Sequence, residues 1–224
     1  MAKNNQQEPQ QEQVTTTVSG VEEFIRKNQK WIEWVLIALI VVILGGMAIH
    51  RWVIVPARQE AQGQVYKAEQ AFRAGDFETA LNGDGNNLGF NDIISKYGTK
   101  GGKSVYLYAG LCKLQTGNNE EAIACLKKYN VKDKILQGRA YCAIGDAYTN
   151  LKDYSNALSF YKKAAALEDN DLAAGYLFKA ALVSEECGDM AGALKLYKEI
   201  ETKYPQTIEG YDIQKYITRI ENQK

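Results

Sequence analysis

The stretch of sequence that decides the fold is Tyr141–Ala164, which reads YCAIGDAYTNLKDYSNALSFYKKA. Two small residues, Gly145 and Ala157, lie twelve positions apart on either side of the polar turn Leu151–Asp153. Helices on the two sides of this turn can approach each other closely at the small residues, and a large side chain such as Tyr161 would fill the space around that contact. The spacing therefore predicts an antiparallel helix pair.

This twelve-residue spacing recurs along the chain. The further pairs are Ala68 and Ala80, Gly110 and Ala122, and Ala181 and Ala193. The second members of the four pairs follow one another at intervals of 42, 35 and 36 residues. A single helix pair leaves an apolar face uncovered, and stacking of neighbouring pairs buries it. The sequence therefore predicts an all-α solenoid of about four helix pairs. We expect a C-terminal capping helix to close it, with these apolar residues along one side: Ile208, Tyr211, Ile213, Tyr216, Ile217 and Ile220.

The quoted stretch resembles the tetratricopeptide repeat, whose pattern is W-x2-L-G-x2-Y…A-x3-F…P. This resemblance implies a protein-binding surface lined by the first helix of each pair. Members that grip a carboxylate at a chain end use Lys and Asn at positions that here carry other residues, so that clamp is not expected. The positions are occupied by Val65 and Glu69, Leu107 and Leu111, Cys142 and Asp146, and Phe178 and Leu182.

We expect the partner-binding surface to be an apolar groove for a helix or an extended segment instead. Its predicted residues are Val65, Phe72, Leu107, Leu111, Leu114, Asp146, Phe178, Leu182 and Glu185. The alternative is that these side chains form core contacts with an adjacent helix.

An insertion separates the first and second repeats, where Asn91 is expected to cap a short helix that ends at Tyr97. The segment Gly75–Cys112 is similar to the corresponding stretch of a family of single-anchor envelope proteins that carry these repeats. In its layout, the whole chain resembles the YfgM-type ancillary subunit of the bacterial Sec translocon. That resemblance implies protein or peptide partners in the cell envelope, either translocon components or a periplasmic chaperone.

The N-terminal part carries a candidate membrane span. Residues Trp34–Ile49 include no charged side chain, and after His50 and Arg51 a second apolar piece, Trp52–Val55, follows. A single helix over both pieces would be about 33 Å long, which matches a hydrocarbon core of about 30 Å. Trp34, Arg51 and Trp52 would then anchor its two ends near the headgroups. A buried core helix and a cleaved signal peptide are weaker alternatives.

These observations divide the chain into three parts. Residues 1–18 are polar and rich in Gln, which predicts a disordered cytoplasmic tail. Residues 19–56 would form an amphipathic juxtamembrane segment and the membrane helix, and residues 57–224 the repeat domain. More cations precede the span than follow it, which favours a single-pass inner membrane protein with a cytoplasmic N-terminus and a periplasmic repeat domain.

The sequence argues against an enzyme and against bound cofactors. It has 27 basic and 27 acidic residues, so a nucleic-acid partner is not expected. A phosphate loop would need Gly at position 97, which is Tyr97, and a calcium loop starting at Asn82 would need Gly and Glu where Asn87 and Ile93 stand. The soluble part has no histidine, so no Ser–His–acid or Cys–His set can be assembled there.

Four cysteines, Cys112, Cys125, Cys142 and Cys187, show no C-x-x-C spacing, and their pairing stays open. The functional hypothesis is a membrane-tethered adaptor of the cell envelope, associated with protein translocation or periplasmic chaperoning. The alternative is a homo-oligomeric structural scaffold of an envelope complex, with no role at the translocon.

Overall fold

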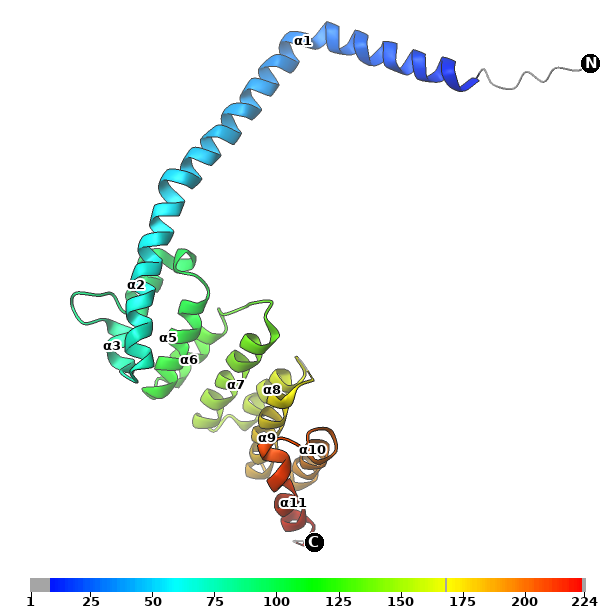
Figure 1. Ribbon diagram of the computed structural model, residues 1–224. Helices are drawn as coiled ribbons and strands as arrows, with labels where there is room; N and C mark the ends of the chain where they lie inside the picture. The colour runs from blue at the N-terminus through cyan, green and yellow to red at the C-terminus, as the bar shows by residue number, and fades with distance from the viewer. Residues whose placement is uncertain (1–8, 168, 223–224) are drawn as a thin grey trace, which may run out of the picture. The chain divides into compact units, whose positions relative to one another are not determined.

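The computed structural model describes residues 9–167 and 169–222, and every regular element within them is a helix (Figure 1). The all-α prediction is therefore confirmed. The chain falls into two compact units, Met1–Pro56 and Ala57–Lys224.

The first unit is a long helix. α1 spans Pro9–Ile49, so the predicted boundary at residue 19 lies inside it. Of the predicted disordered tail, residues 1–8 lie outside the described residues, and residues 9–18 form the start of α1. Pro is well tolerated at the first helical position, and the Gln and Glu residues that follow favour helix. The helix therefore begins ten residues before the predicted boundary at residue 19.

The helix changes pitch before the second unit. A π-helical turn covers His50–Ile54, and the Val55 N–H donates to the carbonyl five residues back. Pro56 has no N–H to donate to the carbonyl four residues back, which accounts for the wider turn at this place. Arg51 and Trp52 lie in this turn.

The apolar stretch is long enough to cross a membrane, and none of its most apolar window is buried among the described residues. Trp34 is 72% exposed and Trp52 is 78% exposed. A buried core helix would need protein neighbours over this stretch, and the described residues supply none. The core-helix alternative is therefore disfavoured.

The second unit consists of stacked helices (Figure 1). In order they are α2 (Val55–Arg73, of which Ala57 onward belongs here), α3 (Phe77–Asn82), α4 (Phe90–Tyr97), the 3-10 turn η2 (Gly98–Gly101), α5 (Ser104–Gln115), α6 (Asn119–Leu126), α7 (Lys134–Asn150), α8 (Tyr154–Ala165), α9 (Asp171–Glu186), α10 (Met190–Lys203) and α11 (Ile208–Glu221). Successive helices from α5 to α11 pack against one another, with α5/α6, α7/α8 and α9/α10 as pairs before the closing helix α11. α2 and α3 form the first pair through a shared core. This is the predicted solenoid.

The small residues sit at the helix crossings, as predicted. A Cβ atom added to Gly145 would lie 2.6 Å from the ring of Tyr161, and one added to Gly110 would lie 2.5 Å from Cγ of Leu126. Ala157 is fully buried at the same crossing as Gly145. Only small residues allow the paired helices to come this close.

The turn inside each pair has one repeated geometry. One residue adopts a left-handed conformation, and the next N–H donates to a carbonyl five residues back, as in a Schellman motif. The left-handed residues are Gly75, Gly117, Lys152 and Gly188. Aspartates then cap α3, α8 and α10 through Asp76, Asp153 and Asp189. Among the four left-handed residues Lys152 is the exception, because the side chain of a residue other than glycine disfavours the left-handed conformation.

The insertion completes the first repeat. α3 ends at Asn82, and α4 then contributes the buried side chains Phe90, Ile93 and Tyr97 to the same core. The prediction that Asn91 caps α4 is wrong, because the helix begins at Phe90 and the Asn91 amide donates to the Asn82 side chain. The chain enters the helix two residues early because the N-cap residue Gly89 lies directly against the end of α3, where a Cβ atom would be 2.2 Å from the Leu81 carbonyl.

The closing helix α11 buries one face only. Ile213, Ile217 and Ile220 are buried, whereas Ile208 is 85% exposed and Tyr211 is 73% exposed. The prediction that all its apolar residues lie along one side is therefore wrong for Ile208 and Tyr211. Positions 213, 217 and 220 share a face at helical spacing, and positions 208 and 211 lie on another.

Candidate functional site

The predicted groove residues do not form one surface. Val65 and Leu107 are buried in the core, which is the alternative weighed for them. Phe72 packs edge-on against Phe77 and Tyr108, while Leu111 and Leu114 pack against the core around α6 and α7. Leu182 is 38% exposed.

The two acidic residues of that set are held in ion pairs between successive first helices. Asp146 on α7 accepts hydrogen bonds from Lys179 on α9, at 2.6 and 2.9 Å, and from the Tyr161 hydroxyl at 2.7 Å. Glu185 on α9 similarly contacts Arg219 on α11 at 2.5 Å and accepts from the Tyr197 hydroxyl. These carboxylates join neighbouring repeats.

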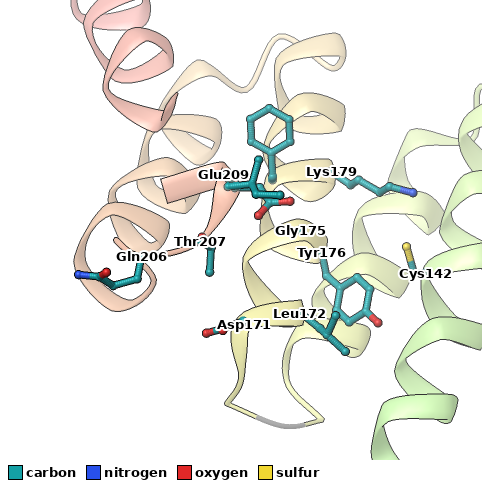
Figure 2. Close-up of a pocket in the computed structure, with 11 residues that line it drawn as sticks. Cys142, Asp171, Leu172, Gly175, Tyr176, Lys179, Gln206, Thr207 and Glu209 are labelled. Carbon is teal, nitrogen blue, oxygen red and sulfur yellow. The ribbon is translucent and has the colours of Figure 1, made fainter. Parts of the chain in front are cut away.

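A pocket of about 650 Å³ opens on the face formed by α7, α9 and the start of α11. These are the first helix of the third pair, the first helix of the fourth pair, and the closing helix. The lining residues are Cys142, Asp171, Leu172, Gly175, Tyr176, Phe178, Lys179, Gln206, Thr207, Ile208 and Glu209 (Figure 2). Phe178 is the only predicted groove residue among them.

Helix α9 supplies most of the pocket through one stripe. Leu172, Tyr176 and Lys179 follow each other at helical spacing, and Figure 2 shows Lys179 extending toward α7, which carries Cys142. Gly175 lies in the same stripe and leaves room for Glu209 of α11, whose carboxylate would be 3.2 Å from a Cβ atom there. The glycine thus lets the start of α11 close one side of the pocket.

Two ionisable groups of the pocket, Cys142 and Lys179, have raised pKa values. Burial raises the pKa of the Cys142 thiol to about 11, so it stays protonated. Burial alone would lower the pKa of the Lys179 ammonium, but Cys142, once its thiol ionises, and the hydrogen-bonded Asp146 carboxylate more than compensate, and the pKa is raised. Neither group is a ready nucleophile, and an apolar wall with a neutralised charge pair is suited to holding a side chain of a partner.

The described residues contain no group of three His, Cys, Asp or Glu side chains that could hold a metal ion. The calcium-like loop is a tight turn, in which Asp84 accepts from the backbone of Asn86 and Asn87 and from the Asn87 amide. The phosphate-loop-like segment forms η2 and leads into α5. Cys112, Cys125, Cys142 and Cys187 all carry free thiols.

Sequence reasoning missed Leu172, Tyr176, Lys179, Ile208 and Glu209 as pocket residues. The predicted groove residues Leu182 and Glu185 lie in the second half of α9, whereas most of the pocket residues on this helix lie in its first half. The spacing of Leu172, Tyr176 and Lys179 along one side of a helix is a local pattern from which this wall of the pocket could have been predicted. No local sequence pattern indicates that Ile208 and Glu209 of α11 form the other side of the pocket.

Comparisons with known proteins agree on the repeats. Residues 138–171 and 175–207 match two family models of the tetratricopeptide repeat. These segments cover most of the third and fourth helix pairs, including the α7 and α9 walls of the pocket. Tetratricopeptide repeats are a typical scaffold for interactions with protein partners, and the chain carries them at the pocket.

One curated relative is the 43 kDa receptor-associated protein of the synapse from Gallus gallus. It is 38% identical over 71 residues, which is 30% of this chain and 17% of the relative. The chain thus spans a small part of that protein's length.

Two solved structures share the fold. The crystal structure of MamA aligns with a TM-score of 0.53 and 21% identity, over 69% of this chain and 92% of MamA. A second MamA crystal structure aligns with a TM-score of 0.55 and 19% identity, over 74% of this chain and 87% of that chain. At this identity the likeness concerns the fold.

Proposed function

We propose that this chain is a membrane-tethered adaptor that holds a polypeptide partner in the pocket between α7, α9 and α11. The observation that carries the proposal is the pocket itself, whose apolar lining includes Leu172, Tyr176 and Phe178. It lies within repeats whose usual role is protein binding, in a chain with one helix long enough to span a membrane. Tethering raises the effective concentration of the adaptor near membrane-bound partners, so weak binding is sufficient.

The proposal includes an orientation. Arg26, Lys27 and Lys30 precede the apolar stretch, whereas Arg51 and Arg58 lie at its other end. Cations near a span favour the cytoplasmic side, so we place the N-terminus there and the repeat domain on the periplasmic side of an inner membrane. Reporter fusions after residue 30 and after residue 224 test this orientation, and activity of a periplasmic reporter at residue 30 would reverse it.

Photo-crosslinking tests the pocket. Benzoylphenylalanine replaces Leu172 or Tyr176 in the full chain, and a matched control places it at Ser159, an exposed position on α8. We expect a discrete protein adduct from the two pocket positions and none from the control. Equal adducts at all three positions, or none, would contradict a partner site in this pocket.

The finer proposal is that the partner belongs to the translocation site or is an emerging polypeptide near it. It rests on the resemblance in layout to the YfgM-type subunits. The same crosslinked adducts decide this point when they are identified by mass spectrometry. Recovery of translocon components supports it, and recovery of only unrelated envelope proteins removes the translocation role while leaving the adaptor.

A second candidate is self-association, which the exposed apolar face of α11 favours. Ile208 and Tyr211 are largely uncovered at the place where a further repeat would stack. Sedimentation of the full chain in detergent separates the two candidates. A dimer that Ile208→Ser and Tyr211→Ser together convert to a monomer supports the scaffold, and a wild-type monomer disfavours it.

A further inference from the structure

The repeat domain carries exposed lysines along one edge, although the whole chain is neutral. This edge comprises the connections that lead into α5 and α7. It carries five exposed lysines, which we call the lysine edge: Lys100, Lys103, Lys128, Lys132 and Lys134. Within the described residues, none of the five forms an ion pair with a carboxylate.

Two contacts bring the lysines from different connections together. Lys103, just before α5, donates to the carbonyl of Asn130 in the α6–α7 connection at 2.5 Å. Lys128, from that same connection, lies 5.8 Å from the centre of the Tyr106 ring in the first turn of α5. Lys100 lies in η2, three residues before Lys103. Lys132 lies just before α7, and Lys134 is the first residue of that helix.

The acidic residues near the lysine edge are already engaged. Asp133 caps α7 by accepting from the Leu136 N–H. Glu60 on α2 accepts from the Tyr97 hydroxyl at 2.6 Å and from Lys96 at 3.1 Å. Neither carboxylate forms an ion pair with one of the five lysines, and five lysines against the single charge of Asp133 leave the edge with a net positive charge.

The Glu60 contact also locates this edge along the chain. Tyr97 is the last residue of α4, directly before η2, and it contacts Glu60 on α2. Glu60 lies only five positions after Val55, which is the last residue of the apolar stretch. Five helical residues span about 8 Å, which is close to the Debye length in physiological salt. Where the apolar stretch ends in a membrane, charges close to Glu60 lie within electrostatic reach of the headgroups, and Lys100 of the lysine edge follows Tyr97 by three residues.

We propose that the lysine edge binds the anionic headgroups of the bilayer that holds the anchor, and so docks the repeat domain on the membrane surface. This rests on the membrane tethering in the proposed function but is independent of the pocket. Each lysine near an anionic surface contributes about 1 kcal/mol, a factor of about five. Loss of three lysines should therefore lower the ratio of docked to undocked domain by about a hundredfold.

The test uses the full chain in lipid nanodiscs with a fluorophore on the lysine edge. Asn130→Cys in a Cys187→Ser background carries the label, because burial raises the pKa values of Cys112, Cys125 and Cys142 and slows their labelling. Native Cys187, exposed at the opposite edge where α9 ends, carries the label in the control. Lipids with a nitroxide headgroup quench a fluorophore that comes near them.

We expect quenching at residue 130 to rise when phosphatidylglycerol replaces about one third of the phosphatidylcholine, and to fall again in high salt. The triple variant Lys128→Gln, Lys132→Gln and Lys134→Gln should lose this rise. A matched triple variant of exposed lysines elsewhere, Lys152→Gln, Lys195→Gln and Lys215→Gln, should keep it.

Quenching that does not depend on phosphatidylglycerol, or that rises equally at Cys187, overturns the proposal. A soluble poly-glutamate peptide that binds the lysine edge in phosphatidylcholine nanodiscs, with no response to phosphatidylglycerol, assigns the edge to an acidic polypeptide and also overturns it. Failure of the chain to enter nanodiscs would contradict the membrane tether of the proposed function, a separate outcome from absent docking.

Discussion

The two halves of the repeat domain cover their first helices in different ways. In the C-terminal half, the second helices α8 and α10 have 12 and 14 residues and carry the large core tyrosines Tyr161 and Tyr197. In the N-terminal half, α3 and α6 have only 6 and 8 residues. There α4 and the connecting residue Tyr129 supply the missing core side chains. The comparison teaches that a short second helix is tolerated when a neighbouring segment fills the space.

The largest expected effect tests whether α4 is structural. Phe90 is fully buried and stacks on Tyr108, with ring centres 5.6 Å apart. Phe90→Ala should lower the free energy of unfolding by about 3–5 kcal/mol because it leaves a cavity in the first repeat. Urea denaturation followed by circular dichroism measures this. Tyr211→Ala, at an exposed position, should change it little, and an equally small effect at Phe90 would make α4 a surface insertion.

The close crossing of α7 and α8 gives the next effect. Gly145→Ala places a Cβ atom 2.6 Å from the Tyr161 ring, so the helices must separate. We expect a loss of about 1–3 kcal/mol in urea denaturation. Gly63→Ala is the matched control, because nothing lies within 4 Å of its Cβ position on α2. It should be stabilising by up to about 1 kcal/mol, and the same sign at both sites would refute the crossing argument.

The left-handed turn residue sets the α7/α8 pair apart from the other three pairs, and its effect is smaller. Lys152 has φ 60°, whereas the equivalent positions carry glycine. Lys152→Gly should stabilise the domain by about 0.5–1 kcal/mol, because relief of the strained conformation exceeds the entropy that glycine adds to the unfolded chain. Gly117→Lys should destabilise by a comparable amount. Thermal melting of both variants checks the pair, and a loss at Lys152→Gly contradicts the strain.

The smallest expected effect concerns the turn before α4. The side-chain amide of Asn87, followed by the N–H groups of Asn87 and Asn86, lowers the pKa of the Asp84 carboxyl below its ordinary 3.8. A lowered folded-state pKa stabilises the fold above the ordinary value, and that contribution disappears as the pH falls through the lowered pKa. Asp84→Asn should therefore be less stable than wild type at neutral pH, with the difference vanishing in acid.

Urea midpoints at about pH 7 and about pH 3 measure this difference. A difference at Asp84 that grows in acid would reverse the sign that we expect.

The sequence was a good guide to contacts within a helix pair and a poor guide to contacts between pairs. Gly145 and Ala157 predict their crossing because the turn between them is short, so few geometries are open. The pocket depends on Cys142, Tyr176 and Glu209, which no local pattern relates. Asp146 and Glu185 were expected on a binding surface, yet their positive partners come from the next first helix or the closing helix and hold them in ion pairs.

By itself, the sequence determined the all-α solenoid and the apolar stretch long enough to cross a membrane. Both follow from local regularities, namely helical spacing of small residues and an uninterrupted run of apolar side chains. Only the tertiary structure decided where the pocket lies, which charges are neutralised and which lysines gather on one edge. Those properties arise where residues distant in the chain meet, and the stacking of helices sets them.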